Sequence, residues 1–259
     1  MSQLLLIINA DDLGISQQVN EAVFDLMAER RISSATLMAN APAVRHAAAQ
    51  IQHFSNCSFG VHLNLTQFAP VTGGHASQLI VDGTGQFSRA IETASPRLAR
   101  LRAIYEEWCA QIDLLISLGV PISHFDSHHH VHTTPYLFPV LKAVQKRYRV
   151  DKVRISKNLY QSEQPCPRGL YRKKQFYNWA LRHIYPTCTT DAFTEMLSFY
   201  RESCRRTLLY RSIELMVHPG ASYAAEETSV LKTDWLIDIG FPVEMIHYGQ
   251  LAAARVKSL

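Results

Sequence analysis

The sequence predicts an α/β fold in one domain, a closed or nearly closed (β/α) barrel of about seven parallel strands. Apolar runs of strand length alternate with amphipathic helical patterns along the 259 residues, which is typical of βαβ units and a parallel sheet. The composition, with 47% hydrophobic and 19% charged residues, is that of a globular protein. Neither GxGxxG nor GxxxxGKS/T follows an expected strand, so the motifs of dinucleotide-binding and P-loop folds are missing.

The first strand is a continuous apolar run at residues 4–8, as expected for a strand buried on both faces of a parallel sheet. Later strands are expected at residues 35–38, 59–65, 122–128, 153–156, 189–193, 213–217 and 243–247. Helices are expected at residues 16–31, from 42 to about 53, 97–118, 134–149, 172–184, near 198–209 and near 226–239. Residues 70–96 show no lasting periodicity and are predicted to form a long surface loop.

Charge, hydropathy and cysteine usage exclude several classes of protein. Lysine and arginine exceed aspartate and glutamate by 26 − 22 = 4, an excess too small to indicate a nucleic-acid partner. No apolar run approaches the ~18 residues of a membrane span, and the N-terminus has neither the basic start nor the apolar length of a signal peptide. The five cysteines are scattered and odd in number, which predicts reduced thiols. We therefore expect a cytoplasmic protein without a transmembrane segment.

Polar residues gather at the carboxyl ends of the expected strands, where parallel α/β folds carry their functional groups. Asp11 and Asp12 follow the first strand, and His62 lies in the third. Arg154 and His218 come at or near the ends of two later strands. Singly, the aspartates would be read as a helix-capping turn and His62 as a core histidine. Their shared position at strand ends indicates a functional site instead.

The segment 124–132 holds five of the twelve histidines of the chain. Because side chains alternate along a strand, His124, Asp126 and His128 are expected to face the same way. Imidazoles with a carboxylate suit Zn²⁺ or another first-row divalent ion, and a site richer in oxygen would suit Mg²⁺ or Mn²⁺. No cysteine lies near these histidines in sequence, which favours an open, hydrolytic metal site over a structural zinc site.

Four blocks of the chain resemble a known family. They are NADDLG at residues 9–14, GVHLNLT at 60–66, HFDSHHHVH at 124–132 and MVHPG at 216–220. In order and spacing they resemble the YdjC-like (ChbG/HpnK) carbohydrate deacetylases, which belong to the polysaccharide-deacetylase-like proteins. Each block alone is weakly specific, whereas the four together are highly specific. The resemblance extends from residue 4 to about residue 251 and is weakest over residues 160–211.

This resemblance implies a distorted (β/α) barrel that holds one divalent metal ion, Mg²⁺ or Zn²⁺, through Asp12, His62 and His128. It also implies that the substrate is an N-acetylated amino sugar, that the N-acetyl group is hydrolysed, and that the protein is a homodimer. In such a reaction we expect Asp11 to act as the general base. His218, from a different strand end, would protonate the departing amine.

Three further residues are expected to support the site. Asp126 would orient an imidazole, as carboxylates do behind metal-bound histidines. Arg154 would hold a sugar hydroxyl or a negative group, and His132 is expected to bind substrate or to support the site. His132 also offers an alternative ligand set, because a helical turn would put His128 and His132 on one metal without His62. Val131 and the Thr-Thr-Pro sequence after His132 make such a helix an unfavourable choice.

Two other functions remain open at this point. The first is a metal-dependent hydrolase of another amide or of a phosphoester, since fold does not fix substrate; two metal ions per chain would favour the phosphoester. The second is a non-catalytic carbohydrate- or metal-binding protein, against which the presence of both Asp11 and His218 argues. The basic segments 168–174 and 201–211 are interpreted as solvated surface, with an anionic glycan as the alternative.

Overall fold

A computed structural model describes residues 3–251, and at its centre is a seven-stranded parallel sheet. The strand order is β4-β3-β2-β1-β6-β5, and β7 pairs with β1 outside this sequence. The strands are β1 (Leu4–Leu13), β2 (Ser34–Leu37), β3 (Ser58–Leu63), β4 (Ile122–Ser127), β5 (Ala192–Glu195), β6 (Ser212–Val217) and β7 (Val243–Met245). This sheet confirms the predicted α/β class.

β1 is the central strand, and it contains a bulge near its carboxyl end. One edge of β1 pairs with β6, and the other pairs first with β7 and then with β2. Between Ala10 and Leu13 the strand advances three residues while β2 advances two, from Ala35 to Leu37. An extra residue on one strand of a pair is a β-bulge, which bends the strand and redirects its side chains. The expected strand at residues 4–8 therefore continues through the two aspartates.

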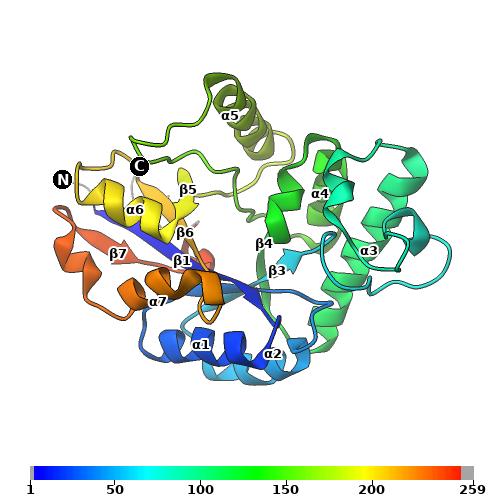
Figure 1. Cartoon of the computed structure of the whole chain (residues 1–259), viewed down its shortest axis with the longest axis horizontal. Coiled ribbons are helices and arrows are strands. Elements are labelled where there is room, and N and C mark those ends of the chain that lie inside the picture. The colour runs from blue at the N-terminus through cyan, green and yellow to red at the C-terminus, as the bar shows by residue number, and fades with distance from the viewer. Residues whose placement is uncertain (1–2, 252–259) are drawn as a thin grey trace.

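Helices surround the strands, as the barrel prediction requires (Figure 1). They are α1 (Gln17–Ala28), α2 (Val44–Gln50), α3 (Leu98–Ser117), α4 (Phe138–Tyr148), α5 (Arg168–His183), α6 (Met196–Ser203) and α7 (Ala225–Leu231). Ser16 caps α1, since its hydroxyl accepts the backbone N–H of Val19 at 3.1 Å. The predicted apolar face of this helix, including Val23 and Leu26, is buried against the sheet.

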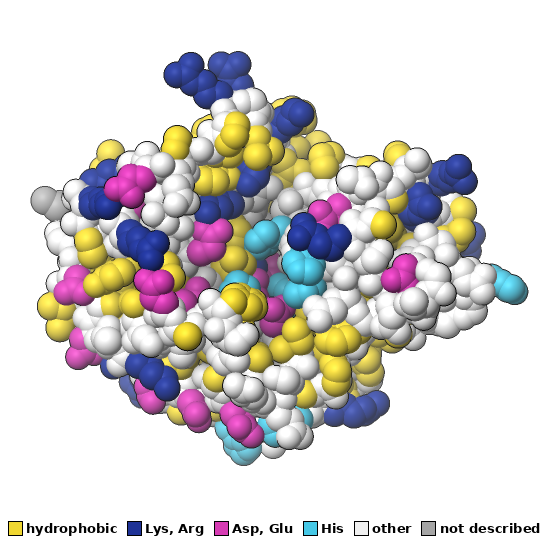
Figure 2. Space-filling model, in the orientation of Figure 1, with side chains coloured by type: hydrophobic (Ala, Val, Ile, Leu, Met, Phe, Trp, Pro, Cys, Tyr) yellow, Lys and Arg dark blue, Asp and Glu magenta, His cyan; other side chains and the backbone are white. Residues whose placement is uncertain are grey.

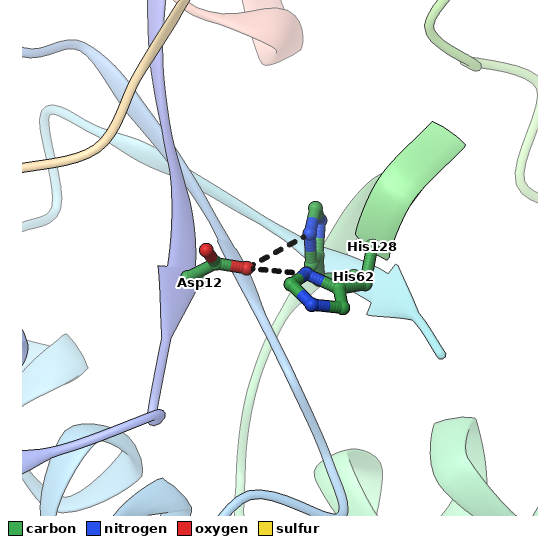
Figure 3. A group of neighbouring side chains, drawn as sticks. All are labelled: Asp12, His62 and His128. Atoms are coloured by element: carbon green, nitrogen blue, oxygen red, sulfur yellow. Dashed lines mark hydrogen bonds and ion pairs between the residues drawn. The ribbon is translucent and has the colours of Figure 1, made fainter. Parts of the chain in front are cut away.

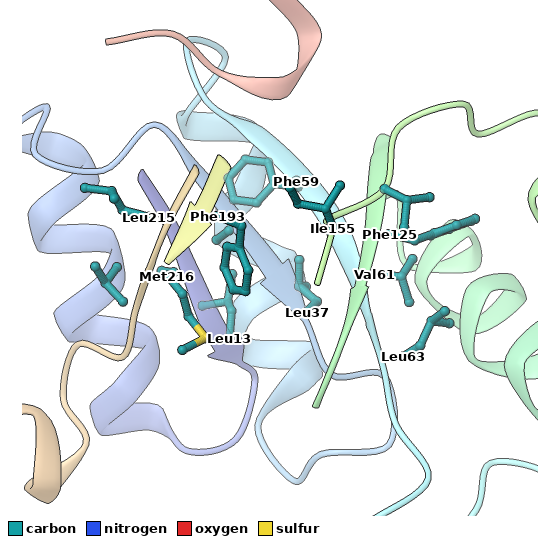
Figure 4. Packing of buried hydrophobic residues seen from close by; sticks show 14 of the residues in the cluster. Leu13, Leu37, Phe59, Val61, Leu63, Phe125, Ile155, Phe193, Leu215 and Met216 are labelled. Atoms are coloured by element: carbon teal, nitrogen blue, oxygen red, sulfur yellow. The ribbon is translucent and has the colours of Figure 1, made fainter. Parts of the chain in front are cut away.

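One core cluster connects the sheet to the helices that cover it (Figure 4). All residues of β3 are buried, among them the apolar side chains of Phe59, Val61 and Leu63. Their neighbours in the cluster include Phe125 from β4 and Phe193 from β5. Burying a side chain of this size contributes roughly 1.5–3 kcal/mol, so the core holds the strand ends in fixed positions around the site.

The strand expected at residues 153–156 is wrong, because only isolated bridges form there. Val153 pairs with Phe125, and Lys152 pairs with Cys188, both in parallel sense. The ladder stops because the Asn178 side chain of α5 takes both backbone groups of Ser156, accepting its N–H at 2.8 Å and donating to its carbonyl at 3.0 Å. These bridges extend from the β4 edge of the sheet to the segment just before β5. β5 itself begins three residues later than expected.

Two expectations about the chain as a whole can be compared with the described residues. Among residues 3–251 no helix combines the length and the apolar character needed to cross a membrane. The five cysteines are free, as the scattered spacing predicts. The argument against a signal peptide rests partly on Met1 and Ser2, which lie outside the described residues.

Candidate metal centre and active site

The bulge in β1 explains how two consecutive aspartates contribute to one site. In a regular strand Asp11 and Asp12 would point to opposite faces. Asp12 instead has a left-handed backbone, with φ of 62°, and both aspartates line the same cavity. A non-glycine residue in this conformation is uncommon and costs of order 1 kcal/mol, so the surrounding strands hold it in place.

One carboxylate oxygen of Asp12 faces two imidazoles that come from different strand ends (Figure 3). Its Oδ1 is 2.8 Å from Nδ1 of His128 and 3.2 Å from Nε2 of His62. His62 lies in β3, whereas His128 directly follows β4. All three side chains are buried, and their ligand atoms lie within 4.8 Å of one another. A carboxylate and two imidazoles at this spacing can hold a metal ion.

Each imidazole uses its other ring nitrogen to bind a fixed acceptor. Nδ1 of His62 lies 2.7 Å from Oδ1 of Asp126, and Nε2 of His128 lies 2.9 Å from Oε1 of Gln67. Such outer hydrogen bonds fix the tautomer and leave the inner nitrogen as the ligand atom. Burial would lower the pKa of His62, but the carboxylates of Asp126 and Asp12 outweigh it and raise this pKa to about 10. The site thus has the electrostatics to favour a cation.

Arg154 is the buried cation behind this group. Its guanidinium donates two hydrogen bonds of 2.6 Å to Asp11 and one of 2.8 Å to Glu214, and it forms an ion pair with Asp126 at 2.8 Å. Burial alone would raise the pKa of Asp11, yet the Arg154 charge and hydrogen bonds hold it well below its ordinary value. Arg154 is fully buried, so the expectation that it contacts a sugar hydroxyl is wrong; the negative group it holds is Asp11 of this chain.

Asp11, His62 and Asp126 form a second group close enough to hold a cation. Here, however, the guanidinium of Arg154 already binds both carboxylates. A dication placed among them would be repelled by that guanidinium and would compete for the same oxygens. The geometry therefore favours one metal position, at Asp12, over two.

Asp11, Asp12, His62 and His128 line a cavity of about 320 Å³ at the carboxyl ends of the strands. Histidine, acidic and basic side chains gather around a hollow on this face of the molecule (Figure 2). His218 follows β6 and lines the cavity together with Tyr223, their ring centroids 5.6 Å apart. The backbone N–H of His218 donates to Oε1 of Glu227 in α7 at 2.5 Å, which fixes the start of the turn. The cavity thus brings Asp11, Asp12 and His218 together from two neighbouring strands.

His132 does not lie among the possible ligands. Its Nδ1 is 2.5 Å from the hydroxyl of Ser127, and its Nε2 is 3.1 Å from the backbone carbonyl of Arg154. Both ring nitrogens are therefore occupied, and the side chain is fully buried. Because His132 is in neither group of side chains that could hold a metal among residues 3–251, the alternative ligand pair of His128 and His132 is wrong. The ring lies beneath the backbone of Arg154 rather than at the cavity, so substrate contact by His132 is wrong as well. The residue instead positions the backbone that carries Arg154.

His124 shares the inward face of β4 but serves the core. Its ring stacks on Tyr248 at 3.7 Å, and its nitrogens lie 2.7 Å from the Ser123 hydroxyl and 3.1 Å from Oδ1 of Asn9. Burial and the nearby Arg154 charge keep its pKa well below the ordinary value, so the ring is neutral. The sequence thus predicted that His124 and Asp126 face the same side of β4, but it did not predict that His124 packs in the core.

Several residues of the site were not predicted from the sequence. Thr36 donates to Oδ2 of Asp126 at 3.0 Å, and Gln67 holds His128. Glu214 and Glu227 are buried carboxylates in or beside β6. Thr36 and Glu214 are polar residues inside expected apolar strands, and that anomaly is the signal that would have identified them.

The fold and the site together define an α/β protein with a candidate metal centre at the carboxyl ends of its parallel strands. The family model described as YdjC-like protein matches residues 5–242, and the chain belongs to this family. The resemblance of the four sequence blocks is thereby confirmed.

Similar proteins have been named after one activity. A carbohydrate deacetylase of Vibrio campbellii is 40% identical over 144 residues, which cover 56% of this chain and 56% of that protein. The match thus spans about half the length of that relative. A carbohydrate deacetylase of Brevibacillus brevis is 30% identical over 237 residues, covering 88% of this chain and 89% of that protein.

A solved structure agrees with the fold. The crystal structure of a putative cellobiose-phosphate cleavage protein from Enterococcus faecalis aligns with a TM-score of 0.74 and 22% identity. The alignment covers 96% of this chain and 99% of the other. At this level of identity the likeness supports the architecture and leaves the reaction to be argued from the site.

Proposed function

We propose that this protein is a metal-dependent hydrolase that removes the N-acetyl group from an N-acetylated amino sugar or oligosaccharide. The observation that carries the proposal is the pair of imidazoles that share Oδ1 of Asp12, each with its outer nitrogen hydrogen-bonded to a fixed acceptor. The relatives named carbohydrate deacetylase supply the substrate class.

Asp12, His62 and His128 would hold the ion. Two nitrogens and a carboxylate oxygen suit Zn²⁺ better than Mg²⁺, which prefers oxygen ligands, and either ion remains part of the proposal. When bound, a divalent ion supplies Lewis acidity that polarises the acetyl carbonyl and acidifies the attacking water. Asp126 and Gln67 keep the two imidazoles oriented for this role.

Asp11 would accept the proton of the attacking water. Its carboxylate stays ionised because Arg154 holds its pKa well below the ordinary value, so it is free of the proton that it must receive. The two hydrogen bonds from Arg154 fix both of its oxygens beside the cavity. Arg154 is thus a positioning residue for the base.

His218 would donate a proton to the departing amine. It lines the cavity from β6, the strand next to the one that carries Asp11. An amine is a poor leaving group until it is protonated, so such an acid contributes roughly 10²–10⁴-fold to the rate. His218→Ala is expected to lower kcat by that range while leaving metal content and thermal midpoint unchanged. A lower midpoint with normal turnover of the folded protein would reject the acid role.

Hydrolysis of a phosphoester is the less favoured function. Many enzymes that act on phosphoesters use two metal ions about 3.5–4 Å apart. In this protein Arg154 lies where a second ion would compete for Asp11 and Asp126. A measured content of two ions per chain would reverse this preference.

The proposal is tested by acetate release. Purified, metal-loaded protein is incubated with N-acetylated mono-, oligo- and lipid-linked saccharides, and acetate and free amine are measured together. We expect equal amounts of both from at least one saccharide, with loss of the reaction on chelation and recovery on adding the ion back. A phosphorylated sugar is assayed beside them, and release of its phosphate with no acetate from any N-acetylated saccharide would contradict the proposal.

A further inference from the structure

His129 and His130 adopt an unusual backbone at the mouth of the site. Their φ and ψ angles are 50° and 23° for His129, and 55° and 27° for His130. Both residues are therefore in the left-handed region, which non-glycine residues rarely occupy and almost never in succession. Strain of this kind concentrates where a side chain must be held in a particular place. Both histidines line the cavity that contains Asp11 and Asp12.

The two side chains differ in what they bind. Nδ1 of His129 lies 2.9 Å from the hydroxyl of Thr66, and its ring packs on that of His128 at 4.0 Å. His130 packs its ring edge against Phe193, with centroids 5.5 Å apart, and Thr133 donates to its backbone carbonyl at 2.9 Å. Its Nδ1 is buried and has no hydrogen-bond partner among residues 3–251. His130 is thus held firmly in place while its ring stays unpaired.

The unpaired nitrogen determines which tautomer is favoured. A buried N–H without an acceptor costs more than a buried lone pair without a donor, and orphaned N–H groups are correspondingly rarer. Nδ1 should therefore carry the lone pair, which places the proton on Nε2. Nε2 is not among the buried, unpaired atoms of residues 3–251, and no hydrogen bond from it to these residues is found. His130 accordingly has an N–H donor available at the cavity.

We propose that His130 is a substrate-binding residue whose Nε2–H donates a hydrogen bond to an oxygen atom of the saccharide in this cavity. This inference rests on the proposed function for its ligand class, since a saccharide supplies hydroxyl, ring and carbonyl oxygens as acceptors. The left-handed backbone at residues 129–130 is the means by which the ring is turned toward the cavity. This backbone strain serves to place the ring for binding, and it does not stabilise the fold.

Substituting glycine for His130 separates an effect on saccharide binding from an effect on stability. Glycine adopts the left-handed backbone without a steric penalty, so His130→Gly should keep or raise the thermal midpoint, by roughly 2–4 °C at most. His130→Asn also tolerates this backbone and keeps an N–H donor on a shorter side chain. Arg149→Gly is the matched control, because Arg149 is exposed, has φ of 55° and does not line the cavity.

Binding is measured by calorimetry with N-acetylglucosamine and its β-1,4-linked dimer, in metal-loaded protein carrying Asp11→Asn to prevent turnover. In that background we expect His130→Gly to weaken binding about tenfold, which corresponds to one lost hydrogen bond. His130→Asn should keep more of the affinity than His130→Gly, and Arg149→Gly should keep all of it. Unchanged affinity in His130→Gly, or a large fall in its thermal midpoint, would overturn the proposal.

The tautomer gives a test that requires no saccharide. The ¹⁵N chemical shifts of His130 in the free protein, assigned by their loss in His130→Asn, should report the proton on Nε2. A proton on Nδ1 would overturn the inference whatever the substrate is. If neither saccharide binds to the protein with His130 intact, acetate release from the wider set of saccharides tests the proposed substrate class. The tautomer and the thermal midpoint of His130→Gly still test this inference.

Discussion

Asp11 and Asp12 are adjacent in the chain but bind opposite kinds of partner. Asp11 is held by the Arg154 guanidinium, and Asp12 faces two imidazoles. The bulge makes this division possible, because it turns both side chains toward one cavity while giving them different neighbours. A carboxylate already paired with a cation is a poor metal ligand, whereas Asp12 has no guanidinium partner among residues 3–251.

Neutralising each aspartate should therefore have a different effect on metal binding and turnover. Asp12→Asn removes a charged ligand and is expected to lose both the metal and turnover. Asp11→Asn keeps the ligands and is expected to retain the metal while turnover falls below detection. Metal content and acetate release measured on the same preparations check this. Near-native kcat in Asp11→Asn would mean that another group is the base.

The sequence indicated the residues that meet at Asp12 and the carboxylate of Asp126 behind an imidazole, but not the other partners that hold them. Strand ends rich in acidic and imidazole side chains indicated a metal site, and the resemblance of the four blocks implied Asp12, His62 and His128 as its ligands. Arg154 was expected to hold a sugar hydroxyl or a negative group, and nothing in the sequence indicates that this group is Asp11, 143 residues away. Gln67 was missed for the same reason, since its contact with His128 depends on how the loop after β3 folds.

At the scale of elements, the approach of β3 to β4 depends on a glycine. Phe59 pairs with Ile122 and Val61 with Phe125, so Ser123 and His124 together lie opposite Gly60. A Cβ on Gly60 would lie 2.6 Å from the His124 ring and 2.6 Å from its backbone carbonyl oxygen. No Cβ fits there without moving the strand, because one of the clashing atoms is backbone.

Gly60→Ala should accordingly destabilise the protein by about 1–3 kcal/mol, as overpacking does in a filled core. Gly73→Ala serves as the control, because a Cβ at Gly73 meets no atom within 4 Å. Urea unfolding of both variants measures the difference. Equal stability of Gly60→Ala and Gly73→Ala would show that β3 and β4 are more loosely packed than described.

The junction of β6 and α7 should make stability depend on pH. Burial raises the pKa of Glu227 to about 7, although it accepts the backbone N–H of His218, which opposes the rise. The folded protein therefore keeps this proton between about pH 4.5 and 7, where the unfolded chain has lost it. This contribution to stability is complete below the unfolded pKa and disappears as the pH rises through 7.

Through Glu227 the folded protein loses at most about 3 kcal/mol of stability as the pH rises above 7, because each unit of pKa difference corresponds to 1.36 kcal/mol. Glu227→Gln should remove the part of the pH slope that this carboxyl causes, while Glu226→Gln, on the exposed side of the same turn, should keep it. Free energies of unfolding between pH 4.5 and 8 check the difference. Parallel curves for the wild type and Glu227→Gln would contradict this account.

At the scale of the whole molecule, periodicity predicted the architecture and long-range partners decided its details. The alternation of apolar strands and amphipathic helices was sufficient for a parallel sheet surrounded by helices (Figure 1). The strand at 153–156 was wrong because Asn178, on a helix after the next loop, replaces the neighbouring strand as hydrogen-bond partner. The bulge in β1 was equally invisible, since it exists only relative to β2.

The central claim is that Asp12, His62 and His128 form one metal site, and metal content tests it most directly. The protein and its His62→Ala and His128→Ala variants are loaded with Zn²⁺ or Mg²⁺ and desalted to remove unbound ions. Their metal content is then measured by elemental analysis. The account predicts about one ion per chain in the unsubstituted protein and a loss of that ion in both variants. Full occupancy in both variants would contradict it.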